Sequence, residues 1–470
     1  MGNFSGILSV ARGALSTAQR ATQIASHNIA NANTPGYSRQ REVLSSNAPE
    51  ATPQGIFGTG VTLTDVQRTR DALLDQEYRS NNGDSSGAAM RSQYLQRMET
   101  VFNEPSDTGL SSALDSFYGA WSDLASDPTN ASARIGVQQA GSALARQFNN
   151  AATQLATMKA DTVTRAEADI TTINRISNQI ADYNTQIVSA ESGGKTASDL
   201  RDSRDQLLDT LSGLANVRVI DHTDGSLQVL FGNISLVDGP LAKQVSMSTG
   251  GTMGFQIVGS ADTIRNIGGE LGALQDVYST DIANATSKLD ALAAAVITDV
   301  NAVHRTGWSP SAGNAGNSNP SLGATGSQVD FFDSTPANAT AAHIRLSDAV
   351  SANYNAIAVS DTLNEQGNNR VGLALAALRD SAPSAANVNF GADFRALVGD
   401  VAGSLNEAKN TASVASTMAD QSNQRRTSVF GVSMDEELIQ IMKQQQAYAA
   451  ASKIIKTVDE MMQTLLSLKQ

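Results

Sequence analysis

The chain has 470 residues, enough for several domains, and its 33 basic and 46 acidic side chains give a formal net charge of −13. It contains no cysteine, which excludes disulfides and thiolate zinc sites. The acidic balance argues against a nucleic-acid partner, because counterion release needs a basic surface. No stretch has the roughly 18 apolar residues of a membrane span. The N-terminus also lacks the pattern of a cleaved secretory signal, which leaves the cytoplasm or export by a route that reads no such signal.

Residues 3–29 are predicted to form an amphipathic helix with a weak heptad seam. Small and apolar side chains recur at alternating steps of four and three residues: Phe4, Leu8, Ala11, Leu15, Ala18, Thr22, Ala25 and Ile29. Such small residues allow close helix contact but bury little area, so the helix needs a partner. Pro35 and Gly36 then predict a stop followed by a turn.

The interior of the chain is predicted to be largely helical, with two inserts. Residues 37–66 have an extended pattern. Period-two alternation and Asp-Gly turns predict a β insert that ends near residue 267. Residues 307–326 are rich in Gly, Ser and Asn and predict a loop, and a mixed segment follows. Helical periodicity covers these ranges: 68–79, 88–102, 108–126, 130–190, 197–211, 270–305 and 392–430.

No catalytic, cofactor or metal site is predicted. Gly194, Lys195 and Thr196 suggest a phosphate loop, but Ser189 occupies the position that requires glycine and no strand precedes it. The four histidines are scattered, and a metal site at His222 is disfavoured. Alternating charges over residues 199–209 predict a solvated or subunit-facing helix surface rather than a carboxylate site.

The last stretch, residues 433–470, is predicted to form a long helix that begins with a capping box at Ser433 and Glu436. Its seam contains Met434, Leu438, Ile441, Tyr448, Ile455, Val458, Met462 and Leu465. Further apolar residues widen this stripe, so the helix needs more than one neighbour. We expect the two terminal helices to pair and to self-associate, although closure of an ordinary globular fold is an alternative.

The fold class that follows is mainly α with β inserts. We expect an elongated multi-domain rod with a terminal coiled coil, an inner helical bundle and small β-rich outer domains, with both termini at one end and the inserts at the other. The predicted domains are the following: 1–35 with 433–470 (coiled coil), 36–213 with 268–306 and 390–432 (inner helices), 214–267 (β-rich insert) and 307–389 (second insert, mixed or loop-rich).

Both ends of the chain resemble a known family. The N-terminal pattern consists of Asn28, Asn31, Asn33, Thr34, Pro35, Gly36 and Tyr37. It resembles the signature of bacterial flagellar rod, hook and hook-associated axial proteins, and residues 458–466 resemble their C-terminal signature. The continuation through Ser38, Arg39 and Gln40 is similar to the hook-associated members at the hook–filament junction. Residues 307–383 match least.

The resemblance implies a structural subunit that is exported unfolded by the flagellar type III apparatus and lies outside the cell, at the junction. Its terminal helices would order on assembly. The implied partners are further copies of the chain, the hook protein, the second junction protein (hook-associated protein 3), the export apparatus and a chaperone on the C-terminal helix. The expected interface residues are Leu8, Leu15, Ile29, Leu438, Ile441, Tyr448, Ile455, Val458, Met462 and Leu465. Another axial protein (hook, rod or second junction protein) and an enzyme carried on the axial structure remain as alternatives.

Overall fold

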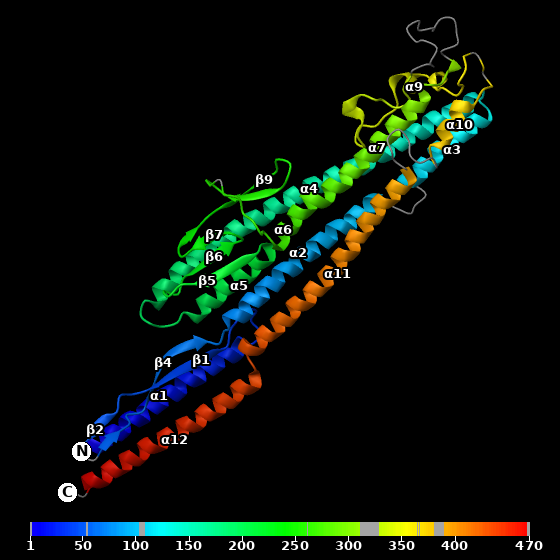
Figure 1. The fold of residues 1–470 in the computed structure, drawn as a ribbon. Helices are drawn as coiled ribbons and strands as arrows, with labels where there is room; N and C mark the ends of the chain where they lie inside the picture. The colour runs from blue at the N-terminus through cyan, green and yellow to red at the C-terminus, as the bar shows by residue number, and fades with distance from the viewer. Residues whose placement is uncertain are drawn as a thin grey trace.

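The computed structural model describes residues 2–52, 55–102, 109–260, 262–310, 329–363, 365, 367–379 and 390–467. The molecule is a rod of long helices that lie along one axis, with both chain ends at the same end of the rod (Figure 1). The predicted fold class, an elongated and mainly helical chain with small β inserts, is confirmed. Among the described helices, none combines the length and the apolar character that a membrane crossing needs.

The terminal end of the rod contains two helices and a β-hairpin. Helix α1 (Gly2–Ala30) and helix α12 (Met434–Ser467) pack side by side, as predicted. Strands β1 (Gln40–Ser46) and β4 (Val61–Arg68) form an antiparallel hairpin that contacts α1. Strands β2 (Glu50–Thr52) and β3 (Gly55–Phe57) pair antiparallel at its tip.

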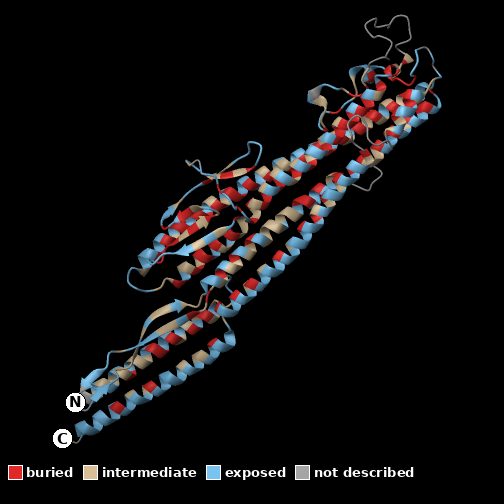
Figure 2. Ribbon diagram, viewed as in Figure 1, coloured by how far each residue is buried: buried red, intermediate tan, exposed pale blue. Residues whose placement is uncertain are grey.

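The inner part of the rod consists of packed helices with one continuous apolar core. Helix α2 packs along α11, α3 packs on α4, and α5 contacts both α2 and α4. Figure 2 shows buried residues along these helices and few on α12. The bounds of the inner helices are α2 (Ala72–Phe102), α3 (Leu110–Ser126), α4 (Ala131–Glu191), α5 (Ser198–Leu214), α6 (Gly269–Asp276), α7 (Ile282–His304) and α11 (Phe390–Phe430).

Two predicted helix boundaries differ from the structure. The separate helices predicted at 68–79 and 88–102 are one helix, α2, because Gly83 and Gly87 lie inside it at points of close backbone contact. A Cβ at Gly83 would lie 2.8 Å from the Ser212 carbonyl oxygen, so tertiary packing maintains a helix that the local sequence disfavours. The helix predicted at 270–305 is interrupted by a π-helical turn, η1 (Val277–Asp281).

The β insert lies beside α4 near the middle of the rod (Figure 1). The prediction that both inserts protrude at the end opposite the termini is therefore wrong for this insert. Asn184 and Asn174 on α4 bond to its strands, at Leu227 and Val245 respectively, and so fasten it along the helix. The insert contains an antiparallel four-stranded sheet and a separate β-hairpin: β5 (Val217–Asp221), β6 (Leu227–Phe231), β7 (Ile234–Asp238) and β8 (Leu241–Ala242), then β9 (Val245–Ser248) and β10 (Gly254–Ile257).

The second insert covers the far end of the rod. His304 is fully buried there, and its Nδ1 donates to the Val329 carbonyl while Nε2 accepts from the Ala358 N–H. Burial lowers the pKa of His304 to about 4, so the ring stays neutral at physiological pH. The short elements are η2 (Pro336–Asn338), α9 (Asp348–Ala352), η3 (Tyr354–Ala356) and α10 (Arg370–Ala377).

Most of the loop predicted at 307–326 lies outside the described residues, as do 364, 366 and 380–389. The four predicted domain ranges remain a prediction.

Candidate assembly interface

The seam between α1 and α12 buries little apolar surface. The buried apolar side chains of α1 are all alanines, at positions 11, 18, 21 and 25. On α12 only Ala451, Val458 and the carboxylate-bearing Glu437 are buried. A buried methylene group contributes about 0.8 kcal/mol, so a seam of alanines stabilises the pair weakly.

The structure brings together only part of the predicted interface set. Leu8, Leu15 and Ile29 are half-buried on α1. On α12, Val458 is buried, and Ile441 and Ile455 are half-buried. The remaining predicted residues of α12 are exposed: Leu438, Tyr448, Met462 and Leu465. The contribution of these residues to an interface between copies remains a prediction.

A set of exposed large side chains, here called the α12 apolar set, runs the length of the helix. At 100° per residue its members fall on more than one side of the helix, and a helix that is apolar on several sides is normally covered on several sides. Helix α1 covers only one of them. The α12 apolar set consists of Met434, Leu438, Ile439, Met442, Tyr448, Ile454, Met461, Met462, Leu465 and Leu466.

The start of α12 is held by residues of the N-terminal motif. Glu437 is 3 % exposed and accepts hydrogen bonds from Asn28 Nδ2 at 3.0 Å and from Arg39 Nε at 2.7 Å. Asn28 in turn accepts from the Tyr37 hydroxyl at 2.8 Å and exchanges two bonds with the Gln40 backbone. This amide therefore joins the end of α1, the start of β1 and the start of α12.

The capping box predicted at Ser433 is only half formed. The Glu436 N–H lies 3.5 Å from Ser433 Oγ, but the Glu436 carboxylate pairs with Arg39 at 2.7 Å. In a full capping box that carboxylate would return to the Ser433 N–H. A tertiary ion pair has replaced the local bond, and this links the first turn of α12 to the motif.

A buried ionic cluster lies next to this point, where the inner helices begin. It is defined as Arg68, Arg70, Arg79, Arg426, Asp75, Asp202, Asp205 and Asp209. Its arginines and aspartates balance in number. Arg79 bridges Asp205 at 3.2 Å and Asp209 at 2.9 Å, and Arg426 of α11 reaches Asp209 at 2.6 Å. The cluster therefore joins α2, α5, α11 and the end of β4.

The N-terminal motif enters the cluster through Ser38. Its hydroxyl donates to Asp202 Oδ1 at 2.6 Å, its backbone N–H donates to Asp202 Oδ2 at 2.8 Å, and Arg70 Nε donates to the hydroxyl oxygen at 2.8 Å. The neighbouring Gln40 donates to Asp199 at 2.7 Å. These bonds attach the segment after α1 to α5.

The rest of the motif forms the turn between α1 and β1. Asn31 donates to the His27 carbonyl and accepts from Thr34. Gly36 has a φ of 78°, which favours glycine, and the Pro35 carbonyl accepts from Gln206 of α5. Asn33 is exposed.

The prediction of a solvated or subunit-facing helix surface over residues 199–209 is wrong for Asp202, Arg204 and Asp205, which are buried inside the chain. Burial alone would raise the pKa of Asp205, but the guanidinium groups of Arg68, Arg79 and Arg70 outweigh it and hold that pKa well below its usual range. Burial raises the pKa of Asp75 despite its arginine neighbours. The pattern of alternating charges is the same for a helix face exposed to water and for one buried against arginines distant in the sequence, so the sequence could not distinguish the two.

The candidate phosphate loop has a structural role. Helix α4 ends at Glu191, and the Thr196 hydroxyl donates to Asp65 of β4 at 2.8 Å. Lys195 bonds to the Thr64 carbonyl. The loop therefore docks α5 onto the hairpin.

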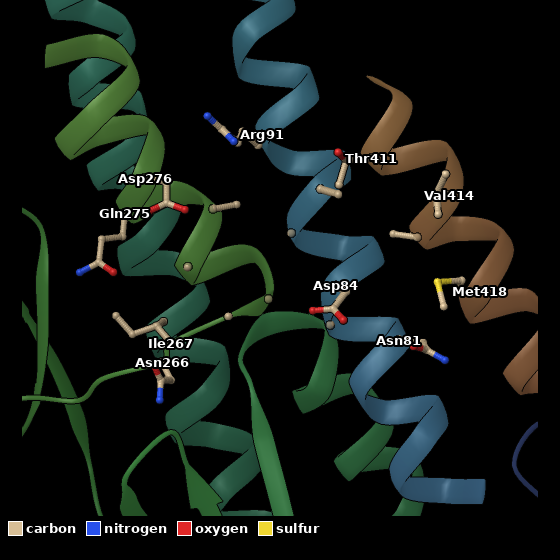
Figure 3. Close-up of a pocket in the computed structure, with 18 of the residues that line it drawn as sticks. Asn81, Asp84, Arg91, Asn266, Ile267, Gln275, Asp276, Thr411, Val414 and Met418 are labelled. Carbon is tan, nitrogen blue, oxygen red and sulfur yellow. The ribbon is translucent and has the colours of Figure 1, made fainter. Parts of the chain in front are cut away.

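A groove of about 840 Å³ crosses α2 between α6 and α11 (Figure 3). Gly83 and Gly87 line it on α2, Val414 and Met418 on α11, and Asp276 at the end of α6. The one arginine in the lining, Arg91, is paired with Asp281 at 3.0 Å. Within the described ranges, no group of three His, Asp or Glu residues could hold a metal ion. We assign no chemistry to this groove.

Three models of known protein families match parts of the chain. The family model "Flagella basal body rod protein" matches residues 8–37, and "Flagellar basal body rod FlgEFG protein C-terminal" matches residues 414–468. Both ends of the chain are thus similar to flagellar rod proteins. A third model, "Flagellar hook-associated protein FlgK helical domain", matches residues 95–318.

The full-length relatives narrow the class. Flagellar hook-associated protein 1 of Bacillus subtilis (strain 168) is 28 % identical over 98 % of this chain and 97 % of its own length. The protein of that name from Salmonella typhimurium is 24 % identical over 99 % and 100 %. The chain is therefore similar to flagellar hook-associated protein 1 along nearly its whole length. The solved flagellar hook junction protein FlgK from Burkholderia pseudomallei is similar at 25 % identity with a TM-score of 0.47, over 51 % of this chain and 45 % of that one.

Asp205→Asn is expected to lower the free energy of unfolding of the inner helices by about 3–5 kcal/mol, because it leaves buried guanidinium groups without their counter-charge. The pKa of Asp205 is lowered in the folded state, so its contribution is complete above the unfolded value of about 4 and is lost as the pH falls below that value. Urea denaturation at pH 7 measures the change. Asp161→Asn, in an exposed pair with Arg97, is the control and should cost less than about 1 kcal/mol. Equal losses would contradict this account of the cluster.

Glu437→Gln is expected to loosen the start of α12, because the amide keeps one acceptor but loses the charge that Arg39 needs. Trypsin cleavage after the exposed Lys443 should accelerate roughly tenfold, which corresponds to about 1.4 kcal/mol. Glu436→Gln changes an adjacent carboxylate that is largely exposed and should leave the cleavage rate nearly unchanged. Similar rates for the two variants would show that Glu437 does not anchor the helix.

Proposed function

We propose that this chain is a structural subunit that joins the hook to the filament of the bacterial flagellum and self-assembles through its terminal helices. The observation that carries the proposal is the α12 apolar set, which the chain itself leaves exposed. A soluble protein rarely exposes a long row of large apolar side chains unless another surface covers it. Copies placed side by side would cover the sides of α12 that α1 leaves open.

The partners in this proposal follow from the family. Further copies of the chain would form one layer, with the hook protein on one side and hook-associated protein 3 on the other. The subunit would leave the cell through the flagellar type III apparatus and act outside it. Before export, a chaperone groove would cover α12, because an amphipathic helix with exposed Met, Leu and Ile suits helix-in-groove recognition.

We infer that the chain is not an enzyme. Buried charges in this chain serve packing: within the ionic cluster, Arg79 pairs with Asp205 and Asp209, and Arg68 pairs with Asp202. An enzyme carried on the axial structure would need a substrate-facing acid, base or nucleophile, and turnover of cell-wall fragments by the purified chain would revive that alternative.

The decisive experiment is deletion of the gene in its own bacterium, followed by complementation. We expect the deletion strain to form hooks without filaments and to release flagellin into the medium, and the native chain to restore filaments. Leu438→Asp places a charge in the α12 apolar set and should fail to restore them. Leu241→Asp, at an even more exposed apolar position on β8, should restore them fully.

Two controls make the result decisive. Circular dichroism should show that Leu438→Asp keeps the inner helices, and its presence in the medium should show that it is still exported. Complete filaments on the deletion strain would refute the junction role. Filaments restored by Leu438→Asp would refute assembly through α12.

A further inference from the structure

A pocket of about 210 Å³ lies where α4 begins, at the end of the rod opposite the chain termini (Figure 1). The turn before α4 and parts of the second insert line it. Arg134, in the first turn of α4, belongs to this lining and is only 5 % exposed. The cavity is here called the Arg134 pocket. Buried charges in proteins are normally paired, so the partners of Arg134 decide what the pocket can hold.

The guanidinium group of Arg134 bonds to neutral groups. Its Nη1 donates to the Ile357 carbonyl at 2.5 Å, and its Nη2 donates to the Pro128 carbonyl at 2.7 Å. Each bond uses one hydrogen, so Nε and both Nη atoms retain a hydrogen to donate. Burial lowers the pKa of Arg134 to about 10, and the side chain therefore keeps its charge at physiological pH. Among the described residues, no acidic side chain acts to raise this pKa.

Other buried arginines of this chain have acidic neighbours. Arg79 pairs with Asp205 and Asp209 in the ionic cluster. Asp205 also acts on Arg204 and raises its pKa against the effect of burial. Arg134 differs, because the described part of the chain leaves its charge unbalanced. An opposite charge brought by another molecule would stabilise a charge in this position.

The sequence near the pocket does not supply the counter-charge. Glu365 is the one acidic residue of the described lining, but it is exposed and forms no ion pair with Arg134. Residues 311–328, 364 and 366 adjoin the lining in sequence and lie outside the described residues, and they contain no Asp or Glu. The counter-charge is therefore left to another molecule.

The lining suits a carboxylate. A planar carboxylate matches the fork of N–H groups that a guanidinium presents. Arg134 contributes one positive charge and Glu365 one negative charge, so a singly charged anion is favoured over a doubly charged one. The lining also contains neutral side chains that can donate hydrogen bonds: Trp308, Ser309 and Asn355.

We propose that the Arg134 pocket binds a carboxylate, which pairs with the guanidinium group and supplies its counter-charge. Two sources have this chemistry: a small free carboxylate, and an Asp or Glu side chain of a neighbouring copy. The second source is abundant, because the chain has 46 acidic side chains and a net charge of −13. This inference goes beyond the junction role, and binding to the free subunit does not depend on that role.

Tryptophan fluorescence tests the pocket, because Trp308 lines it and the only other tryptophan, Trp121, is fully buried in the core. The purified full chain would be titrated with sodium acetate against sodium chloride of equal ionic strength. We expect a saturable change with its midpoint in the millimolar range, and Trp308→Phe should remove it. Sodium sulfate should bind at least tenfold more weakly. Tighter binding of sulfate would overturn the carboxylate assignment, and absence of a saturable change with acetate would overturn the proposal.

A matched pair of variants tests the geometry. Ala131 lines the pocket three residues before Arg134, so a carboxylate placed there lies on the same face of α4. Ala131→Glu should supply the counter-charge itself, abolish the acetate response and raise the midpoint of thermal unfolding. Ser132→Glu adds the same charge to the same exposed turn, but outside the lining, and should keep the acetate response. Loss of the response in both variants, or in neither, would contradict the site.

Complementation of the deletion strain distinguishes the two sources. If a side chain of a neighbouring copy fills the pocket, Ala131→Glu should restore fewer filaments than Ser132→Glu. If a free carboxylate fills it, the two variants should restore equal numbers. Both results leave the test of assembly through α12 by Leu438→Asp unchanged, so the failure of one proposal does not imply the failure of the other.

Discussion

The buried ionic cluster is the constraint on which the rest of the structure depends. It joins α2, α5 and α11 at the point where the inner rod meets the terminal helices, and Ser38 brings the N-terminal motif into it through Asp202. Desolvated charges stabilise a fold only when each one is paired and hydrogen-bonded. The cluster therefore contributes more to the specificity of the fold than to its net stability, because it fixes one geometry for the segment that leads from α1 to the hairpin.

The inner helices and the terminal helices differ in how strongly packing stabilises them. The inner helices share a continuous apolar core, with Trp121, Phe117 and Phe331 fully buried at the far end. The terminal pair has a seam of alanines and one anchored carboxylate, Glu437. The inner rod therefore has a continuous core of its own, whereas α12 buries few residues against its own chain. In the proposed assembly, neighbouring copies would cover the rest of α12.

Much of the fold could be predicted from the sequence, because long helices leave a strong periodic pattern. The helix at 130–190, the C-terminal helix and the β insert follow from that pattern, and the motif from Asn28 to Gln40 indicated the family. The errors have physical causes. Helix α2 continues through Gly83 and Gly87 because of packing that local propensity does not contain. The charges on α5 face arginines far away in the sequence, so periodicity alone could not show that they are buried. Which predicted α12 residues face α1 depended on the register of the pair, which the weak seam did not determine.

The most direct test of the central claim is hydrogen exchange of α12 in two states. Deuterium uptake would be measured by mass spectrometry for the free subunit and for the subunit in purified hook–filament structures. The account predicts that α12 amides exchange at least a hundredfold faster in the free subunit, while α2, α4 and α11 are equally protected in both states. Equal protection of α12 in both states would contradict the claim that neighbouring copies complete this helix.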